Sequence, residues 1–328
     1  MDQPQALEQA QTPGKVWRSL LRRPASPGDG LFRVTTLLAA LSLLGLLLAM
    51  VVYLFGAAWP AIAHFGMGFL MRSTWDPVRE VFGALPAIYG TLVTSALAML
   101  VAVPVSLGTA IFLAELAPGW LRAPASFLVE MLAAIPSVVL GLWGIFVMAP
   151  VLQPVERWLA ESLGFVPFFR GPVFGGVGFL AGGLILSVMA LPIITAVARD
   201  AILTVPASQR EAMLALGATR WEAIRHAVLP YTRSGLVAAS ILGLGRALGE
   251  TMAVTMVIGN GYRLTARLFA PGNTMASKIA TQFNEASGLE TNALVELALV
   301  LFAVALIVNV VGRLLVRWTV ARVAGGGH

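Results

Sequence analysis

The sequence predicts an all-α membrane protein that crosses the bilayer six times. Of its 328 residues, 58% are hydrophobic and 12% are charged, whereas a soluble domain is roughly 45–50% apolar and about 25% charged. Six apolar stretches are each long enough to cross about 30 Å of hydrocarbon as a helix of about 20 residues. They lie roughly at residues 34–58, 86–114, 127–151, 175–198, 234–259 and 293–316.

The composition also excludes several kinds of chemistry. With no cysteine, the chain has no disulfide, thiolate nucleophile or cysteine-based metal site. Its three histidines, His64, His226 and His328, have no second ligand at metal-binding spacing, and we expect no metal, no cofactor and no catalytic residue. The formal net charge of +6 is spread along the chain. A nucleic-acid partner would need a gathered basic patch, so none is expected.

The N-terminal segment differs from the rest of the chain. Residues 1–30 are polar and contain four prolines, which predicts a disordered cytoplasmic tail. Residues 31–328 are then the transmembrane domain, with membrane lipid around its apolar faces. The first apolar stretch follows the polar tail and is longer than the apolar region of a signal peptide, which indicates an uncleaved anchor.

Lysine and arginine counts predict the orientation. With the N-terminus inside, the cytoplasmic segments hold fourteen basic residues and the outer loops hold seven, while Arg246 alone lies within a span. Because cytoplasmic loops carry the excess of basic residues, both termini are predicted to be cytoplasmic. The longest cytoplasmic loop is then 199–233.

The first half of this loop is predicted to form a short helix. Ser208 and Glu211 match a capping box, in which a hydroxyl and a carboxylate three residues later cap a helix N-terminus. Gly217 suits the end of that helix, because glycine tolerates the left-handed conformation.

A second short helix is predicted to follow. Thr219 and Glu222 form another capping box, and Pro230 is expected to end the helix. Two such helices resemble a helix-turn-helix, but a loop held between two spans is poorly placed to enter a major groove, and an ordinary solvated loop is the other alternative. Two caps and several apolar residues favour instead a rigid knob that docks on a partner. These apolar residues are Ala215, Leu216, Trp221 and Ile224.

The loop resembles the EAA loop of ABC-importer permeases. The matching residues are Glu211 and Ala212, then Gly217, and finally Leu229 and Pro230. The resemblance implies that this segment is the coupling helix, which seats in a cleft of an ATP-binding subunit. Two positions depart from the usual pattern but stay apolar, Met213 and Ala227.

Three further stretches resemble phosphate-import permeases of the PstC type. They are 83–118, 133–144 and 242–260, of which the last, LGLGRALGETMAVTMVIGN, is the most distinctive. The resemblance implies an ABC-importer permease fold in a bacterial inner membrane. It also implies the partners: a second, homologous permease subunit, two ATP-binding subunits and an extracytoplasmic phosphate-binding protein.

The fifth apolar stretch contains two charges, Arg246 and Glu250, four residues apart. A buried arginine costs about 2.5–3.5 kcal/mol at the centre of a membrane helix, and pairing on one helix face reduces that cost. One interpretation is an ion pair that fixes the helix register. The other, which the resemblance favours, is a substrate path in which Arg246 binds an anion, Glu250 orients it and Thr251 adds a hydroxyl. Gly245 and Gly249 predict a close helix contact beside the pair.

The sequence contains no G-x-x-x-x-G-K-[ST] phosphate loop, so ATP hydrolysis is expected on a separate subunit and this chain is not expected to be an enzyme. Pro136 and Ser137 predict a kink in the third stretch. The expected function is phosphate import by alternating access. Alternatives are a permease for another oxyanion, the partner permease of the same transporter, an ion-coupled secondary transporter, or an added role in signalling.

Overall fold

A computed structural model describes residues 27–324 of the chain. The predicted tail of residues 1–30 lies almost entirely outside this range. Within it, the β-type pairing is confined to one bridge between Asp76 and Val81. The helices are α3 (Pro27–Phe65), α4 (Gly68–Met71), α5 (Leu85–Ile111), α6 (Gly119–Ala133), α7 (Ser137–Trp143), α8 (Ala149–Ser162), α9 (Phe179–Leu203), α10 (Ala207–Ala215), α11 (Arg220–Ala223), α12 (Leu229–Gly249), α13 (Met252–Val257), α14 (Met275–Gln282) and α15 (Leu289–Ala324). Short π-helical segments continue three of them: η2 (Phe112–Leu116), η3 (Gly144–Met148) and η4 (Ile224–Val228).

Six helical segments of the described chain are long and apolar enough to cross a membrane, which confirms the predicted all-α, six-span fold. They are Gly28–Phe65, Leu85–Leu116, Ser137–Ser162, Phe179–Leu203, Arg220–Gly249 and Leu289–Leu314. The chain divides into two compact units, Met1–Tyr53 and Leu54–His328. The described part of the first unit is the beginning of α3, and the second unit contains all the other helices.

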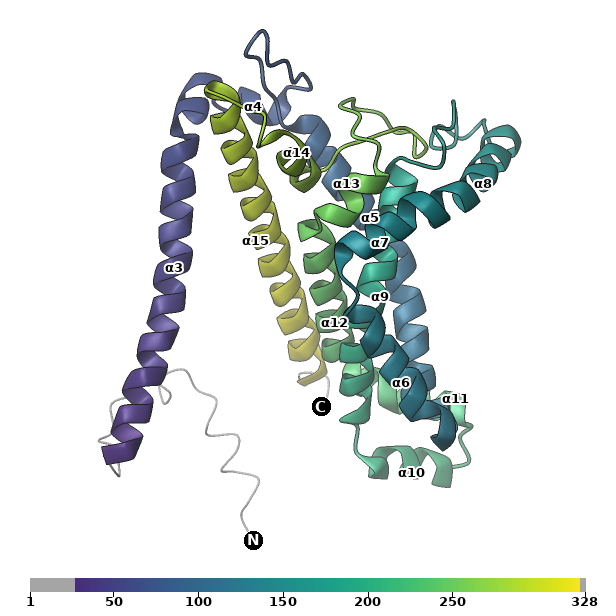
Figure 1. The fold of residues 1–328 in the computed structure, drawn as a ribbon. Helices are drawn as coiled ribbons and strands as arrows, with labels where there is room; N and C mark the ends of the chain where they lie inside the picture. The colour runs from purple at the N-terminus through teal and green to yellow at the C-terminus, as the bar shows by residue number, and fades with distance from the viewer. Residues whose placement is uncertain (1–26, 325–328) are drawn as a thin grey trace. The chain divides into compact units, whose positions relative to one another are not determined.

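Helix α9 forms the centre of the second unit. It packs against α5 and α12 (Figure 1), and 61% of its apolar window is buried, compared with 28% or less in each other span. Its inward residues, such as Ile185 and Ile194, belong to two separate apolar clusters along the helix. Many outer apolar side chains, for example Phe146, stay exposed, as expected where lipid is the solvent.

The third apolar stretch, predicted as one helix over 127–151, is broken in the structure. Helix α6 ends at Ala133, α7 begins at Ser137, and α8 then extends away from the bundle (Figure 1). Pro136 explains the break, because proline has no N–H to continue the ladder and disfavours helical backbone in the residue before it. The kink predicted at Pro136 and Ser137 is confirmed, and it is a complete interruption.

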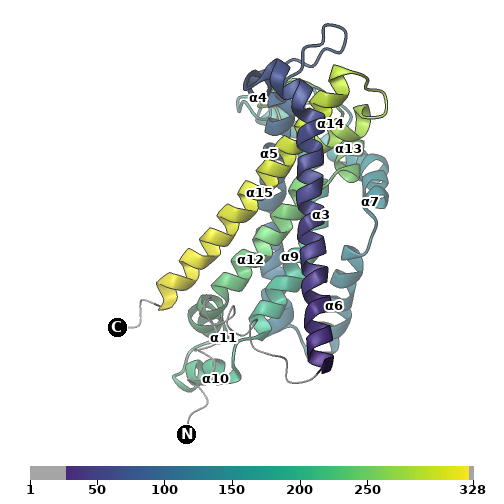
Figure 2. The ribbon, with the colours of Figure 1, turned by 90° about the vertical axis from the view of Figure 1, so that its left-hand side faces the viewer.

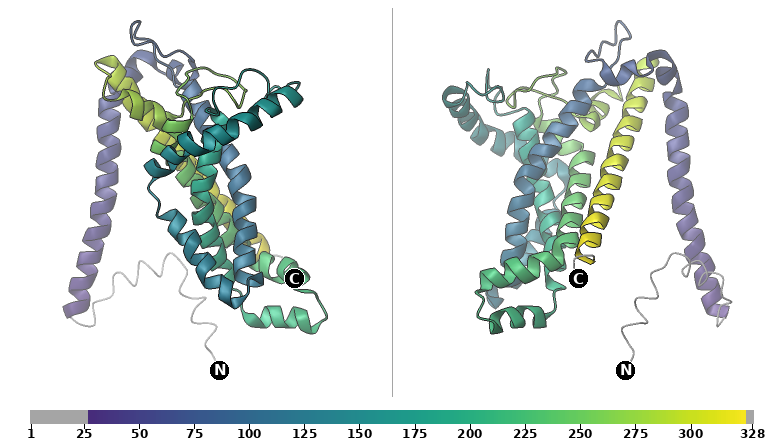
Figure 3. Two further views of the ribbon diagram at one scale, coloured as in Figure 1. Left: turned by 45° about the vertical axis from the view of Figure 1, so that its right-hand side comes forward. Right: turned by 180° about the vertical axis from the view of Figure 1, so that it is seen from behind.

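The two ends of the second unit carry different structures. Helices α10 and α11 project from one end, and α14 with the long 258–274 connection lies at the other (Figures 2 and 3). At the α14 end, the buried Lys278 ammonium lies 4.7 Å from the Trp75 ring centroid and 4.5 Å from that of Tyr262. Trp75 Nε1 also donates to Glu290 Oε1 at 3.0 Å. Burial lowers the pKa of Lys278 to about 8, and the Glu290 charge opposes this shift. This cluster fastens three outer segments and the start of α15 together.

Candidate functional site

The fifth span is not one continuous helix. Helix α12 ends at Gly249, Glu250 is extended with φ −74° and ψ 128°, and α13 begins at Met252. Arg246 lies in the last turn of α12 and Glu250 is its C-cap, so the chain turns after Glu250 and the two side chains pair four residues apart, as predicted. Interrupted membrane helices occur where backbone is buried in protein or lines a water-filled cavity, and transporters bind substrates at such interruptions.

The two charges lie close together directly before the break. The Arg246 Nη2 atom lies 4.0 Å from Glu250 Oε2, and the side chains are 40% and 8% exposed. Arg246 is in the last turn of α12, where a helix dipole favours a cation by about 0.3–1 kcal/mol. Within the described chain its guanidinium donates no hydrogen bond. A half-exposed guanidinium with free donors is a suitable partner for an oxyanion.

Glu250 has a second contact that the sequence did not suggest. Its Oε1 atom accepts a hydrogen bond from Ala253 N at 3.3 Å, so the carboxylate caps the N-terminus of α13 as well as pairing with Arg246. Thr251 occupies the break itself. Its hydroxyl donates weakly to Gly249 O at 3.4 Å, and its carbonyl accepts from the Thr255 hydroxyl at 2.6 Å. Glu250 therefore connects the arginine to the position of α13.

Helix α13 packs closely on α7, the half-helix that follows the break in the third span. A Cβ atom at Gly141 would lie 2.6 Å from Met256 Sδ and 3.0 Å from Ala253 Cα. The close contact predicted at Gly245 and Gly249 is not found, because a Cβ there would meet a single atom at 3.8 Å and nothing, respectively. The close glycine contacts on α12 are instead at Gly235 and Gly243, where an added Cβ would lie 2.5 Å from Ala201 Cβ and 2.4 Å from Ile194 Cγ1 of α9, respectively.

The loop 199–233 contains the two predicted short helices, with one of the two predicted caps. Helix α10 begins at Ala207 behind Pro206, and no side chain caps it. The capping box at Ser208 and Glu211 is therefore wrong, because the N-cap is Pro206, two residues earlier than predicted, which leaves Ser208 inside the helix. Gly217 adopts φ +85° after α10, which confirms the predicted left-handed turn.

The second predicted cap is present. The Thr219 hydroxyl accepts from Glu222 N at 3.3 Å, and Glu222 Oε2 accepts from Thr219 N at 2.7 Å. Pro230 does not end this helix as predicted. It lies in the first turn of α12, where the missing N–H has no cost, and η4 joins α11 to α12.

The surface of the loop is open and largely apolar. Glu211 and Ala212 are exposed on α10, and the side chains of Leu216 and Trp221 are 84% and 57% exposed. A shallow groove separates α10 from the start of α12 and includes Pro230. It is lined by Gln209, Ala212, Met213, Leu216, His226, Ala227, Pro230, Tyr231 and Arg233. Leu229 lies next to this groove at the first residue of α12.

The predicted site residues therefore fall into two groups. Arg246, Glu250 and Thr251 meet at the break in the fifth span, whereas the EAA-like residues gather around α10 at one end of the unit (Figure 2). The ion pair between Arg210 and Glu115 was not predicted from the sequence. A charged residue directly before Glu211 and another at the end of the second span were the available signals.

A family model described as a binding-protein-dependent transport system inner membrane component matches residues 106–325. The matched segment includes both groups of residues. The chain belongs to this family. It is therefore a transport subunit of a multi-pass inner membrane system and not an enzyme, as predicted.

Named relatives support the membership. The phosphate transport system permease protein PstC of Haemophilus influenzae is 47% identical over 88% of this chain and 93% of its own length. The probable phosphate transport system permease protein PstC of Methanocaldococcus jannaschii is 37% identical over 88% of this chain and 93% of its own. The predicted resemblance to PstC-type permeases is thus confirmed.

A solved structure shares the fold. A chain of the inward-facing MetNI methionine ABC transporter superposes with a TM-score of 0.55, at 19% identity, over 75% of this chain and 99% of its own. At this identity the likeness concerns architecture alone. It confirms the ABC-importer permease fold for the family member described here.

Proposed function

We propose that the chain is the phosphate-conducting permease subunit of an ATP-driven importer, and that Arg246 binds phosphate in the path. One observation carries the proposal: Arg246 is 40% exposed at the break in a membrane span, beside a carboxylate at 4.0 Å, with no hydrogen bond of its own among the described residues. The names of relatives that match along most of their length add the substrate, phosphate.

The geometry around Arg246 explains how this one cation could bind phosphate transiently and then release it. Its planar fork of donors fits two phosphate oxygens at once. Glu250 holds the guanidinium loosely and stays mostly buried, so the pair is neutral when the path is empty. Thr251 offers a hydroxyl whose bond to Gly249 O, at 3.4 Å, is weak enough to exchange. Phosphate would then replace Glu250 as the partner of Arg246 for a short time.

The EAA-like loop is proposed as the site where an ATP-binding subunit docks. Exposed apolar side chains flank the groove between α10 and α12, as in the desolvated centre of a protein interface. Exposed Glu211 adds a charge at its edge. Because ATP-binding subunits are cytoplasmic, both termini would be cytoplasmic too, in agreement with the basic-residue count.

The rest of the assembly follows from this arrangement. A second, homologous permease would complete the path on the open side of Arg246, and two ATP-binding subunits would engage the two loops. An extracytoplasmic phosphate-binding protein would deliver phosphate at the α14 end. Closure of the ATP-binding subunits would move α10, and the spans would alternate between facing outward and inward. Residues 31–328 would form this permease domain.

Reconstitution in proteoliposomes tests the proposal. Vesicles containing the complete transporter should accumulate labelled phosphate when ATP and the binding protein are supplied, and excess sulfate should not compete. Competition by sulfate would favour the alternative of another oxyanion. Uptake driven by an ion gradient without ATP would favour a secondary transporter and contradict the proposal.

A further inference from the structure

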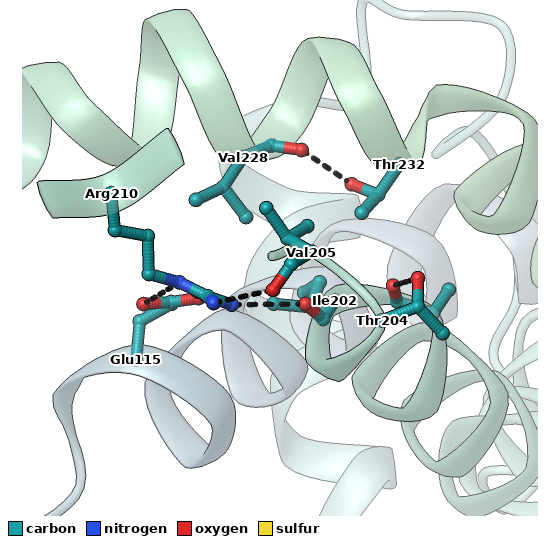
Figure 4. Close-up of polar contacts among 8 residues, drawn as sticks. Glu115, Ile202, Thr204, Val205, Arg210, Val228 and Thr232 are labelled. Carbon is teal, nitrogen blue, oxygen red and sulfur yellow. Dashed lines mark hydrogen bonds and ion pairs between the residues drawn. The ribbon is translucent and has the colours of Figure 1, made fainter. Parts of the chain in front are cut away.

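Arg210 makes the most extensive set of polar contacts in the described chain. Its Nε and Nη2 atoms donate to Glu115 Oε1 at 2.9 and 2.7 Å, and Nε also reaches Glu115 Oε2 at 3.2 Å. Nη1 donates to Val205 O at 2.7 Å and Nη2 donates to Ile202 O at 3.1 Å. Figure 4 shows the guanidinium between the carboxylate and these two carbonyls. All three guanidinium nitrogens therefore donate hydrogen bonds.

These contacts join α10 and the preceding helix α9 to the distant end of α5. Arg210 belongs to α10, Glu115 lies 95 residues earlier in η2 at the end of α5, and Ile202 is in the last turn of α9. The last carbonyls of a helix lack partners within the helix and favour a nearby cation. Arg210 therefore caps α9 and fixes α5 to the same point.

Apart from the Arg210 contacts, few interactions attach α10 to α5 or α9. None of its residues is buried, and within residues 27–324 the side-chain hydrogen bonds that link α10 to a span all come from Arg210. The side chains of Arg210 and Glu115 are 25% and 12% exposed, so water screens their pairing weakly. A bidentate, charge-assisted pair also resists rotation. The link between α10 and α5 is thus short, directional and partly dehydrated.

We propose that Arg210 is a positioning residue that transmits the movement of α10 to α5 through Glu115. The pair ties α10 directly to the end of α5, whereas the backbone joins α10 directly only to α9 and, through α11 and η4, to α12; because α5 also packs along α9, the pair makes the ends of both helices follow α10 as one body. This inference rests on the proposed function, in which an ATP-binding subunit moves α10. The alternative is that Arg210 only caps α9.

Two variants separate these roles. Glu115→Leu removes the link to α5 but leaves Val205 O and Ile202 O to hold Arg210. Arg210→Gln removes the guanidinium, which makes the contacts with both α5 and the end of α9. Arg313→Gln is the control, because Arg313 is exposed in α15, outside the loop 199–233, and forms no hydrogen bond or ion pair in the part of the chain that the structure describes. Arg210→Lys, which keeps the charge, replaces Arg210→Gln if that variant does not assemble.

The first measurement is phosphate uptake per ATP hydrolysed in proteoliposomes holding the complete transporter. Glu115→Leu should lower this ratio at least about tenfold, the factor expected for losing a charge-assisted pair of hydrogen bonds, while ATP hydrolysis continues. Arg313→Gln should keep the wild-type ratio. A wild-type ratio in Glu115→Leu would overturn the inference and leave the proposed function intact. Absence of ATP-dependent phosphate uptake in the wild type would instead refute the proposed function.

The second measurement reports the movement itself. The chain has no cysteine, so spin labels can be placed at Ser208→Cys on α10 and Leu116→Cys in η2, both exposed positions. In the wild type the distance between the labels should be the same without nucleotide and with a trapped ATP analogue. In Glu115→Leu it should change when the nucleotide binds. An unchanged distance in both proteins, or a changing one in both, would show that the pair does not couple α10 to α5.

Discussion

Replacing Gly141 with alanine should disturb the site from the α7 side without touching either charge. The new Cβ would lie 3.0 Å from Ala253 Cα and 2.6 Å from Met256 Sδ. The methionine side chain can rotate away, but the α13 backbone cannot. Since carbon atoms pack best at about 3.5–4.0 Å, α7 and α13 must separate by roughly 0.5–1 Å.

The energetic effect has two opposing parts. Alanine is better than glycine inside a helix by about 0.5–1 kcal/mol, whereas overpacking a close contact costs about 1–3 kcal/mol. Gly108→Ala in α5 is the matched control, because nothing lies within 4 Å of its Cβ position. We therefore expect Gly141→Ala to be less stable than Gly108→Ala by about 1–3 kcal/mol.

Thermal unfolding in detergent, followed by tryptophan fluorescence, measures this difference. Phosphate uptake should also fall in Gly141→Ala, because a displaced α13 moves the N–H that Glu250 caps at 3.3 Å. If Gly141→Ala is as stable as Gly108→Ala and transports normally, the packing of α7 on α13 does not position the site.

Three other predictions concern different parts of the molecule. Gly217→Arg should insert normally yet lose the ATP-binding subunit on co-purification, since φ +85° strains a non-glycine residue by about 1–2 kcal/mol; retained association would show that the loop is not the docking element. Selective 13C-labelling should give two lysine signals, from Lys15 and Lys278, with Lys278 titrating near its lowered pKa of about 8, below the value of about 10.4 for a lysine in an unfolded chain. Because the unfolded chain then binds more protons between these values, stability should rise with pH from about 8 to about 10, and Lys278→Met should remove this rise. A reporter active only in the cytoplasm should give signal when fused at residue 215 or after 320 but none at 165 or 275, and the opposite pattern would reverse the topology.

The fold was predictable because lipid imposes one strong requirement, long apolar helices. The bounds of the second and fourth spans differ little from the predicted stretches, since nothing in α5 or α9 interrupts the helix at a functional break. The third and fifth stretches were harder. Apolar residues continue on both sides of Ala134–Pro136 and of Glu250, so hydropathy over a span-length stretch runs across both breaks, and only proline marked the first.

The candidate site was predictable in composition but not in geometry. Charges within a span identified Arg246 and Glu250, yet the second contact of Glu250 depends on where α13 begins, which tertiary packing on Gly141 decides. The same holds for Arg210. Its partner Glu115 is 95 residues away, and spacing along the chain carries no information about such a pair.

ATP-dependent phosphate uptake by the reconstituted transporter carrying Arg246→Gln tests the central claim most directly. With assembly matched to wild type, uptake should fall at least about tenfold, because a charge-assisted hydrogen bond contributes about 1.5–3 kcal/mol. Arg246→Lys should keep part of the activity, since the charge remains without the fork. Glu250→Gln, which still accepts from Ala253 N, should be affected less. Near-normal uptake by Arg246→Gln would contradict the account. The pair of Arg246 and Glu250 would then have only a structural role, holding α12 and α13 in place at the break.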